Sequence, residues 1–378
     1  MAGMDGACKV STILFRRLQN PRAASTRERD LPPSRLRFYA DRMTTPESTT
    51  TPSDTTATKT AAVIYNPVKV DLDALRESVD RSAADAGWGE SLWFETSVDD
   101  VGQGVTAEAI AAKVDLVIAA GGDGTVRAVS EALRGSGIPL ALLPSGTGNL
   151  LARNLDLTLN DLPGSVITAF TGDDKPIDLG VIDIERADHS RDRHVFVVMA
   201  GMGIDAKMIK NTDDDLKAKA GWAAYVDAIV KSLRDPDELH LRFRIDDEPQ
   251  IRATVHTVII GNCGSLPANI LLLPDAVVDD GLFDLMFMRP GGVFGWIRIW
   301  AKVAWVNGVL RRTKTGRALA GKQKDDGELR YGTAKRFVAR MSKPEEIELD
   351  GDGFGKAVAI NTWIEPGALT VRVPAAAE

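Results

Sequence analysis

Apolar residues in the first half of the chain follow two alternating patterns. Short runs that are apolar at every position are typical of strands buried on both faces, whereas apolar residues three or four positions apart are typical of amphipathic helices. The predicted strands span residues 61–65, 91–95, 116–120 and 139–143, and the predicted helices span 72–86, 107–112 and 126–133. Strands that alternate with helices in this way predict an α/β domain, over residues 61–175, with a parallel sheet covered by helices on both faces.

The second half of the chain is richer in strands. Alternating polarity and β-branched residues predict strands at 176–184, 193–199, 239–246, 251–261, 282–289, 335–341, 346–349, 358–363 and 369–373. Helical spacing is found at residues 221–233 and 294–312. Many strands with few helices predict a β-rich second domain, an antiparallel sandwich, over residues 176–364.

Two glycine-rich turns each follow a predicted buried strand of the first domain. The first is Gly121-Gly122-Asp123-Gly124-Thr125, and the second is Ser145-Gly146-Thr147-Gly148-Asn149. Such turns lie at the carboxyl ends of parallel strands, which is the edge where open α/β sheets bind ligands. Glycine lets the backbone approach an anion closely, and the N–H groups at a helix start favour negative charge. Tight turns alone are the simpler interpretation, but the pair together indicates a phosphate-binding site.

The composition limits which kinds of partner the protein is expected to bind and which cellular compartment it fits. The chain has 378 residues and a net charge of −7, so no overall basic field favours nucleic acid. Its two cysteines, Cys8 and Cys263, lack metal-type spacing and form no disulfide framework, which fits a reducing cytoplasm. No apolar run is long enough to predict a transmembrane helix.

The first 58 residues are predicted to form a disordered tail. Residues 44–60 are rich in threonine, with proline and serine, and such a segment buries too little surface to offset its ordering entropy. Met43 directly precedes this tract, which leaves open whether translation starts there.

The glycine motifs resemble those of the diacylglycerol kinase catalytic-domain family, which also holds sphingosine, ceramide and other lipid kinases. The first motif, GGDGT at 121–125, is shared with NAD kinases, which have a similar fold. The second, LPSGTGN at 143–149, is the more discriminating and favours the lipid-kinase branch. Further matches extend the resemblance from Ala61 to Pro374. It implies that residues 365–375 return to complete the first domain, which binds nucleotide, and that the second domain holds the lipid.

The resemblance also implies a set of residues that contact ATP. They are Asn66, Thr96, Gly121, Gly122, Asp123, Gly124, Thr125, Gly146 and Thr147. In the family, the Asn-Pro turn is followed by a glycine loop, but this chain has Asn66-Pro67-Val68-Lys69. A backbone phosphate cradle is therefore not expected at this turn, where Lys69 supplies a charge instead, and an ordinary Asn-Pro turn remains the alternative.

Two aspartates are the candidate catalytic residues. The stretch E-L-D-G-D resembles the family's (Q/E)-x-D-G-(E/D) motif, in which the first Asp is the catalytic base, and Asp350 takes that position. Asp352 replaces the more frequent Glu. Asp123 is expected to organise Mg²⁺–ATP or its waters. Because a carboxylate is a weak base at its ordinary pKa, Asp350 either acts late in the reaction or has its pKa raised by burial.

A magnesium site is implied by the stretch from Pro274 to Asp284, which matches the family's D-D-G-L-D pattern. By position, its ligands are the Asp280 carboxylate and the backbone carbonyls of Val277 and Leu282. One carboxylate with carbonyls suits Mg²⁺, which prefers oxygen ligands and retains waters. A plain hairpin turn is the alternative interpretation.

Two other segments have open interpretations. Residues 294–312 combine tryptophan and basic residues at helical spacing, as in helices at a membrane interface, but a surface helix packed on the core fits equally. Residues 201–206 resemble a family turn beside the cleft between domains, where a glycine-enabled bend without ligand contact is the simpler interpretation.

The sequence thus predicts an ATP- and Mg²⁺-dependent lipid kinase that converts diacylglycerol to phosphatidic acid. The alternatives are a kinase for another lipid such as sphingosine, an NAD kinase, and a non-catalytic nucleotide- or lipid-binding module. The expected partners are ATP and a membrane lipid resembling diacylglycerol, with no nucleic acid. A cytoplasmic protein with peripheral membrane contact during activity is expected, and the oligomeric state is open between a monomer and a homodimer.

Overall fold

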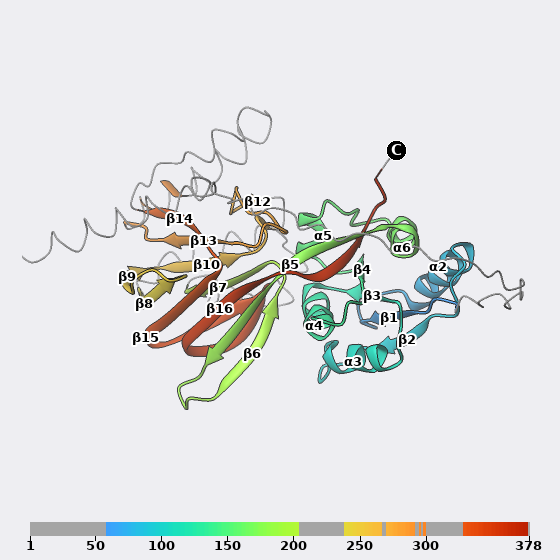
Figure 1. Cartoon of the computed structure of the whole chain (residues 1–378), viewed down its shortest axis with the longest axis horizontal. Coiled ribbons are helices and arrows are strands. Elements are labelled where there is room, and N and C mark those ends of the chain that lie inside the picture. The colour runs from blue at the N-terminus through green and yellow to red at the C-terminus, as the bar shows by residue number, and fades with distance from the viewer. Residues whose placement is uncertain are drawn as a thin grey trace, which may run out of the picture. The chain divides into compact units, whose positions relative to one another are not determined.

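Four parallel strands form the sheet of the first part of the chain, in the order β4-β3-β1-β2 (Figure 1). The computed structural model describes residues 58–203, 238–266, 270–291, 295, 298–299 and 328–376. The elements of this part are β1 (Ala61–Tyr65), α2 (Leu72–Asp85), β2 (Leu92–Glu95), α3 (Gln103–Ala111), β3 (Leu116–Gly121), α4 (Asp123–Leu133), β4 (Leu140–Pro144), α5 (Leu150–Asn154) and α6 (Leu162–Thr171).

The uniformly apolar runs form the strands because both faces of this sheet are covered. Alternate residues of β1 enter two different core clusters, Ala62 and Ile64 in one, and Ala61, Val63 and Tyr65 in the other. Helix α2 packs on the second of these clusters through Leu75, Val79 and Ala83, which recur every four residues. The α/β prediction for the first part is confirmed.

The second part of the chain consists of antiparallel strands. They are β5 (Asp173–Glu185), β6 (Arg191–Phe196), β7 (Met199–Gly203), β8 (Leu239–Ile245), β9 (Ile251–Val255), β10 (Thr257–Gly261), β11 (Ser265–Leu266), β12 (Ile270–Leu271), β13 (Phe283–Met288), β14 (Leu329–Ala334), β15 (Arg336–Leu349) and β16 (Asp352–Val373). The sheet runs β14-β13-β10-β7-β15-β16, and the hairpins β8–β9 and β5–β6 pair beside β15 and β16.

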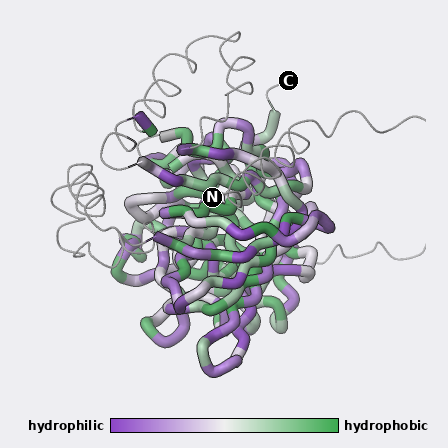
Figure 2. Tube along the Cα trace, turned by 90° about the vertical axis from the view of Figure 1, so that its left-hand side faces the viewer, coloured by the Kyte–Doolittle hydropathy of each residue, from purple (hydrophilic) through white to green (hydrophobic). Residues whose placement is uncertain are grey.

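Strands of this part also pack face to face. The ring of Phe243 on β8 lies 5.1 Å from that of Phe287 on β13, although these two strands are not hydrogen-bonded neighbours. Phe337 on β15 packs against both rings. Apolar segments lie toward the inside of the molecule and polar turns toward its border (Figure 2). The predicted β-rich, sandwich-like second part is confirmed.

Strand β16 connects the two parts. Its first half pairs antiparallel with β15, and Val371 near its end pairs parallel with Leu140 of β4 (Figure 1). This pairing brings the end of β16 to the free edge of the parallel sheet. The Arg134 guanidinium, just after α4, donates to both carboxylate oxygens of Glu365 on β16, at 2.6 and 2.5 Å.

Several predicted boundaries were wrong. Helix α3 begins at Gln103 rather than residue 107, because the Asp100 carboxylate accepts hydrogen bonds from the N–H groups of Gly102, Gly104 and Val105. The strands predicted at 335–341 and 346–349 form one strand with bulges, and those at 358–363 and 369–373 form another.

Other predictions lie outside the described residues. These are the tail before Thr58, the helix at 221–233 and most of the helix at 294–312. Among the helices that the structure describes, none is long and apolar enough to cross a membrane.

Candidate active site

The predicted nucleotide residues lie along the carboxyl edge of the parallel sheet. The N–H of Thr96, after β2, donates to the carbonyl of Tyr65 at 2.9 Å, and the N–H of Asn66, after β1, donates to Ala120 at 3.0 Å. The N–H of Ser145, after β4, donates to the carbonyl of Gly121 on β3 at 3.1 Å. These bonds join each loop to the end of its neighbouring strand, so the four loops form one continuous row.

The two glycine loops touch through their backbones. A Cβ atom on Gly146 would lie 2.8 Å from the Cα of Gly122, a contact that leaves no room for a side chain. Asn149 holds the second loop in this position, because its amide accepts from the N–H of Gly146 at 3.0 Å and donates to the carbonyl of Gly146 at 2.8 Å. Asn149 has a φ of 48°, in the left-handed region that Asn tolerates. This role of Asn149 was not predicted from the sequence, although its place in the second motif was a signal.

Asp123 connects the first loop to the second. Its carboxylate accepts hydrogen bonds from the N–H of Leu150, at 2.5 Å, and the N–H of Asn149, at 2.9 Å, which begin α5. Burial raises the pKa of Asp123, although these two donors oppose the shift, and the nearby Asp352 raises it further. In this arrangement Asp123 positions the second glycine loop.

The three predicted threonines differ in accessibility. Thr96 and Thr125 are buried, and the Thr125 side chain packs against Gly121, where a Cβ would lie 2.7 Å from its hydroxyl oxygen. Thr147, at the tip of the second loop, is exposed. Of the three, Thr147 is therefore the one that is accessible from solvent.

Asp350 lies in the turn between β15 and β16, with a φ of 50° and 2% of its surface exposed. Its carboxylate accepts hydrogen bonds from three successive N–H groups, those of Val197 and Val198 at 2.8 Å and that of Met199 at 2.9 Å. Burial nevertheless raises the pKa of Asp350 to about 6, against the effect of these donors and of Arg127. A carboxylate with this pKa is a stronger base than an ordinary Asp.

Asp352, two residues later, reaches the first glycine loop. A Cβ on Gly124 would lie 2.7 Å from Oδ2 of Asp352, so the glycine makes space for this carboxylate. The turn that carries both aspartates therefore lies against the amino end of α4. The motif identified Asp352, but its position could not be read from sequence because residues that are distant in the chain form the contact.

Arg127 is a buried cation behind this contact. It is 4% exposed, its Nε lies 4.0 Å from Asp352 and its Nη1 lies 3.7 Å from Glu131. The guanidinium stacks over the ring of Phe354 at 4.5 Å, and neither Nε nor Nη1 has a hydrogen-bond partner. Arg127 was not predicted as a site residue, because a charged residue in an amphipathic helix is normally expected to face solvent.

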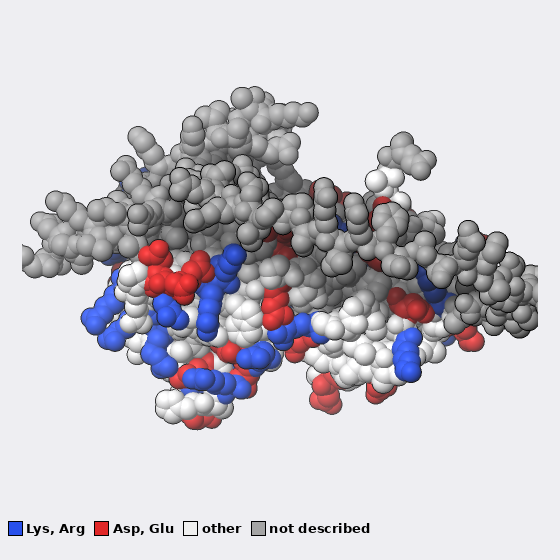
Figure 3. Space-filling view, viewed as in Figure 1, with Lys and Arg blue, Asp and Glu red and all other residues white. Residues whose placement is uncertain are grey.

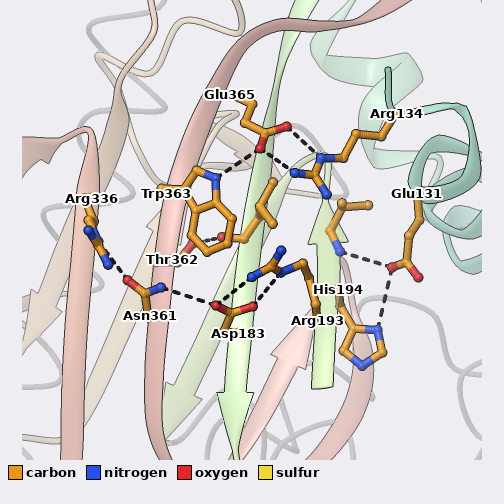
Figure 4. Close-up of polar contacts among 12 residues, drawn as sticks. Glu131, Arg134, Asp183, Arg193, His194, Arg336, Asn361, Thr362, Trp363 and Glu365 are labelled. Carbon is orange, nitrogen blue, oxygen red and sulfur yellow. Dashed lines mark hydrogen bonds and ion pairs between the residues drawn. The ribbon is translucent and has the colours of Figure 1, made fainter. Parts of the chain in front are cut away.

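Glu131, one turn along α4, contacts strand β6. Its carboxylate accepts from the N–H of Val195 at 3.1 Å and lies 3.6 Å from Nδ1 of His194 (Figure 4). These contacts fix α4, and with it the first glycine loop, to the β-rich part of the chain.

A cavity of 260 Å³ opens beside the second glycine loop. Lys69 and Ser145 are among its lining residues, with Leu143, Leu159 and Leu162 as apolar contacts. It contains both charged and apolar lining residues at the carboxyl edge of the parallel sheet. Lys69 is thus close enough to this edge to offer its ammonium group there.

The predicted magnesium stretch forms a tight turn held by Asp178. The Asp178 carboxylate accepts from the N–H of Gly281 at 2.6 Å and from that of Gly367 at 2.8 Å. Oδ1 of Asp280 accepts from the N–H of Leu282 at 3.0 Å, as in the hairpin interpretation. Burial raises the pKa of Asp280, and the carboxylates of Asp178 and Asp279 raise it further.

A cation would relieve this repulsion, so the oxygen donors of the turn are compatible with magnesium. Among the residues that the structure describes, no group of three or more His, Cys, Asp or Glu side chains could hold a metal ion. The set of Val277, Asp280 and Leu282, with only one carboxylate, remains a prediction.

The predicted turn at 201–206 is described only as far as Gly203. Gly203 has a φ of 96°, and a Cβ there would lie 2.0 Å from the carbonyl oxygen of His256. The bend at Gly203 thus requires glycine for steric reasons.

Both parts of the chain match families of known proteins. A family described as "Diacylglycerol kinase catalytic domain" matches residues 60–182, and one described as "YegS C-terminal NAD kinase beta sandwich-like domain" matches residues 197–373. The "Diacylglycerol kinase" of Bacillus subtilis is 26% identical over 79% of this chain and 91% of its own length. A "Probable lipid kinase YegS-like" of Pseudomonas aeruginosa is 30% identical over 72% of this chain and 80% of its own length.

Among solved structures, a diacylglycerol kinase from Bacillus anthracis has the same fold. Its TM-score is 0.62 at 21% identity, over 84% of this chain and 98% of its own. The glycine loops, the D-G-D turn and the two-part architecture lie within the matched regions. The chain belongs to the family of diacylglycerol kinases and YegS-like lipid kinases.

Proposed function

We propose that the protein transfers the γ-phosphoryl group of ATP to the hydroxyl of diacylglycerol and so forms phosphatidic acid and ADP. The observation that carries this proposal is the contact between the D-G-D turn and the first glycine loop, where a Cβ on Gly124 would meet Asp352 at 2.7 Å. A carboxylate from the β-rich part, that of Asp352, thereby lies next to the loops expected to hold the phosphates. Phosphoryl transfer depends mainly on this kind of alignment.

The glycine loops are proposed to bind the phosphates. Gly122 and Gly146 expose backbone at their contact, and Thr147 adds an accessible hydroxyl. Asn66 and Thr96 lie further along the same edge, where the remainder of the nucleotide would bind. Asp123 keeps the two loops at a fixed distance through its bonds to Asn149 and Leu150, so its contribution to ATP binding is through position.

Asp350 is proposed to accept the proton of the lipid hydroxyl. As the hydroxyl oxygen bonds to the γ-phosphorus, the bond from phosphorus to the oxygen of ADP breaks and the proton passes to the carboxylate. Of the roughly four lone-pair positions of a carboxylate, three are used by Val197, Val198 and Met199, which leaves about one for the substrate. The raised pKa, about 6, suits proton acceptance near neutral pH.

Magnesium is proposed to enter with ATP, where it would neutralise charge on the phosphates. Asp352, whose carboxylate lies against Gly124 at the start of α4, and Asp123 are the carboxylates that would hold it. A second, structural Mg²⁺ is proposed at Asp280 with the carbonyls of Val277 and Leu282.

Radiolabelled ATP offered with diacylglycerol, sphingosine or NAD as acceptor tests the proposal. We expect labelled phosphatidic acid from diacylglycerol, and none from the protein with Asp350→Asn. Gly353→Ala is the matched control in the same turn, because a Cβ there meets no atom within 4 Å. Label on sphingosine would make the protein a kinase for another lipid, while label on NAD alone, or no label, would refute a lipid kinase activity.

A further inference from the structure

A row of arginines crosses the solvent-facing side of the β-rich sheet. Arg252 on β9 pairs directly with Arg242 on β8, and Arg242 pairs directly with Arg340 on β15. Residues that lie opposite each other on paired strands point to the same face. All three arginines are exposed, so three guanidinium groups stand side by side on adjacent strands.

The same face carries further arginines along neighbouring rows. Following the register across β15, β16, β5 and β6 gives seven arginines and three carboxylates on this face. We call these residues the arginine face: Arg191, Arg193, Arg242, Arg244, Arg252, Arg336, Arg340, Asp183, Glu185 and Glu365. In a chain with a net charge of −7, this concentration of positive charge is local.

Only part of this charge is neutralised. Glu185 bonds to both Arg340, at 2.9 Å, and Arg191, at 2.8 Å, and Asp183 bonds to Arg193 at 2.7 Å. Figure 4 shows the pair of Asp183 and Arg193. The Asn361 side chain lies between Asp183 and Arg336 and bonds to both. Arg242, Arg244 and Arg252 form no ion pair with any residue in the described part of the chain.

This arrangement is unfavourable for the isolated protein. Like charges directly opposite each other on paired strands destabilise a sheet. Charged residues on edge strands do prevent sheets from aggregating, which would account for Arg252 on β9. That explanation does not extend to Arg242 and Arg340, whose strands have partners on both sides.

We infer that the arginine face binds the surface of an anionic lipid bilayer, an inference that rests on the proposed lipid kinase function. A bilayer presents a broad negatively charged surface, which complements charges spread over several strands of one sheet. Lys and Arg side chains gather over β8, β9, β15 and β6, with Asp and Glu side chains among them, whereas the visible surface over α3 and α4 is mainly uncharged (Figure 3). Because the whole chain is acidic, electrostatic attraction to an anionic membrane requires a local basic surface.

Vesicle flotation tests this inference. The full chain should float with vesicles of phosphatidylcholine and phosphatidylglycerol, and much less with phosphatidylcholine alone. The triple variant Arg242→Gln, Arg244→Gln and Arg252→Gln should lose binding by about 100-fold, at roughly fivefold for each arginine near the lipid surface. The control variant Lys59→Gln, Arg81→Gln and Lys113→Gln removes the same charge from the parallel-sheet part and should bind as the wild type does.

Stability and activity measurements separate the possible outcomes. The triple variant should unfold at the same denaturant concentration as the wild type or a higher one, because repulsion is removed, and should keep its activity on detergent-dispersed diacylglycerol. Wild-type binding by the triple variant, equal binding to both vesicles, or binding to duplex DNA instead of vesicles would overturn the inference. A protein that floats with anionic vesicles but phosphorylates no lipid would refute the proposed function alone.

Discussion

Asp350 and Met199 are joined by two hydrogen bonds in opposite directions. The carboxylate of Asp350 accepts from the N–H of Met199 at 2.9 Å, and the N–H of Asp350 donates to the carbonyl of Met199, also at 2.9 Å. The proposed base is therefore locked to the start of β7 and has little freedom to move. A fixed carboxylate suits a reaction in which the hydroxyl must be held in line with the phosphate.

The activity should depend on pH through Asp350. Because a proton acceptor must be ionised, kcat/KM is expected to rise with pH through about 6, the pKa of this carboxyl, and to level off above it. The pH dependence of kcat/KM with dispersed diacylglycerol measures this. A profile that stays flat through this range would contradict the assignment of Asp350 as the base.

Asp350 should also make stability depend on pH, in the opposite direction to its effect on activity. Its pKa in the folded protein is raised, so its favourable contribution is complete below the unfolded pKa and is lost as the pH rises through about 6. The loss is on the order of 3 kcal/mol, at 1.36 kcal/mol per unit of pKa. Urea unfolding across this pH range measures the free energy of unfolding of the wild type and of Asp350→Asn. As the pH rises, the wild type should lose about 3 kcal/mol relative to the variant.

Arg127 should change the pKa of Asp350 without contacting the substrate. Its charge lowers the pKa of Asp350, so Arg127→Met is expected to move the rise in kcat/KM to higher pH than in the wild type. Arg81→Met, on the exposed surface of α2, is the control and should leave the profile unchanged. If Arg127→Met reduces activity equally at every pH, its role is structural only.

Gly146 should be intolerant of any side chain. Gly146→Ala would push the second loop away from Gly122, and we expect about 1–3 kcal/mol of destabilisation together with a higher KM for ATP. Gly353→Ala serves again as the control because its Cβ meets nothing. Thermal unfolding measures the loss of stability, and titration with ATP measures the KM. An unchanged KM for ATP would show that the contact between the loops does not contribute to nucleotide binding.

Asp123→Ala should remove most kinase activity while the fold survives. The change leaves the N–H groups of Asn149 and Leu150 without their acceptor, so the second glycine loop loses its position. We expect about 1–3 kcal/mol of lost stability, as for a buried donor left unsatisfied. Circular dichroism checks the fold, and near-normal turnover would show that the loop keeps its position by other contacts.

The parallel sheet and the position of its glycine loops were predictable from local sequence patterns. Hydrophobic periodicity marks a strand within a few residues, and the motifs directly follow the strands they end. The continuation of β16 beyond Pro366 and Gly367 was not predictable in the same way, because these residue types usually end a strand. In the structure Gly367 has a φ of 61° and donates to Asp178, so the chain passes through a bulge and continues.

Only some of the candidate site residues could be predicted from the sequence. Family motifs identified Asp123 and Asp350, but not that Asp123 accepts bonds from the second loop or that Asp350 bonds to residues 197–199. These bonds depend on how distant strands pair. Arg127 carried no motif signal, since its burial results from Phe354 and Asp352 folding over it.

The pairing of Val371 with Leu140 has a consequence for synthesis on the ribosome. Strand β4 is made early, but the strand that covers its free side is made about 230 residues later. Until then the nascent chain exposes an apolar strand edge, the kind of surface that joins other chains in aggregates. Chaperone demand during translation, and insolubility of chains truncated before β16, should follow from this order of assembly.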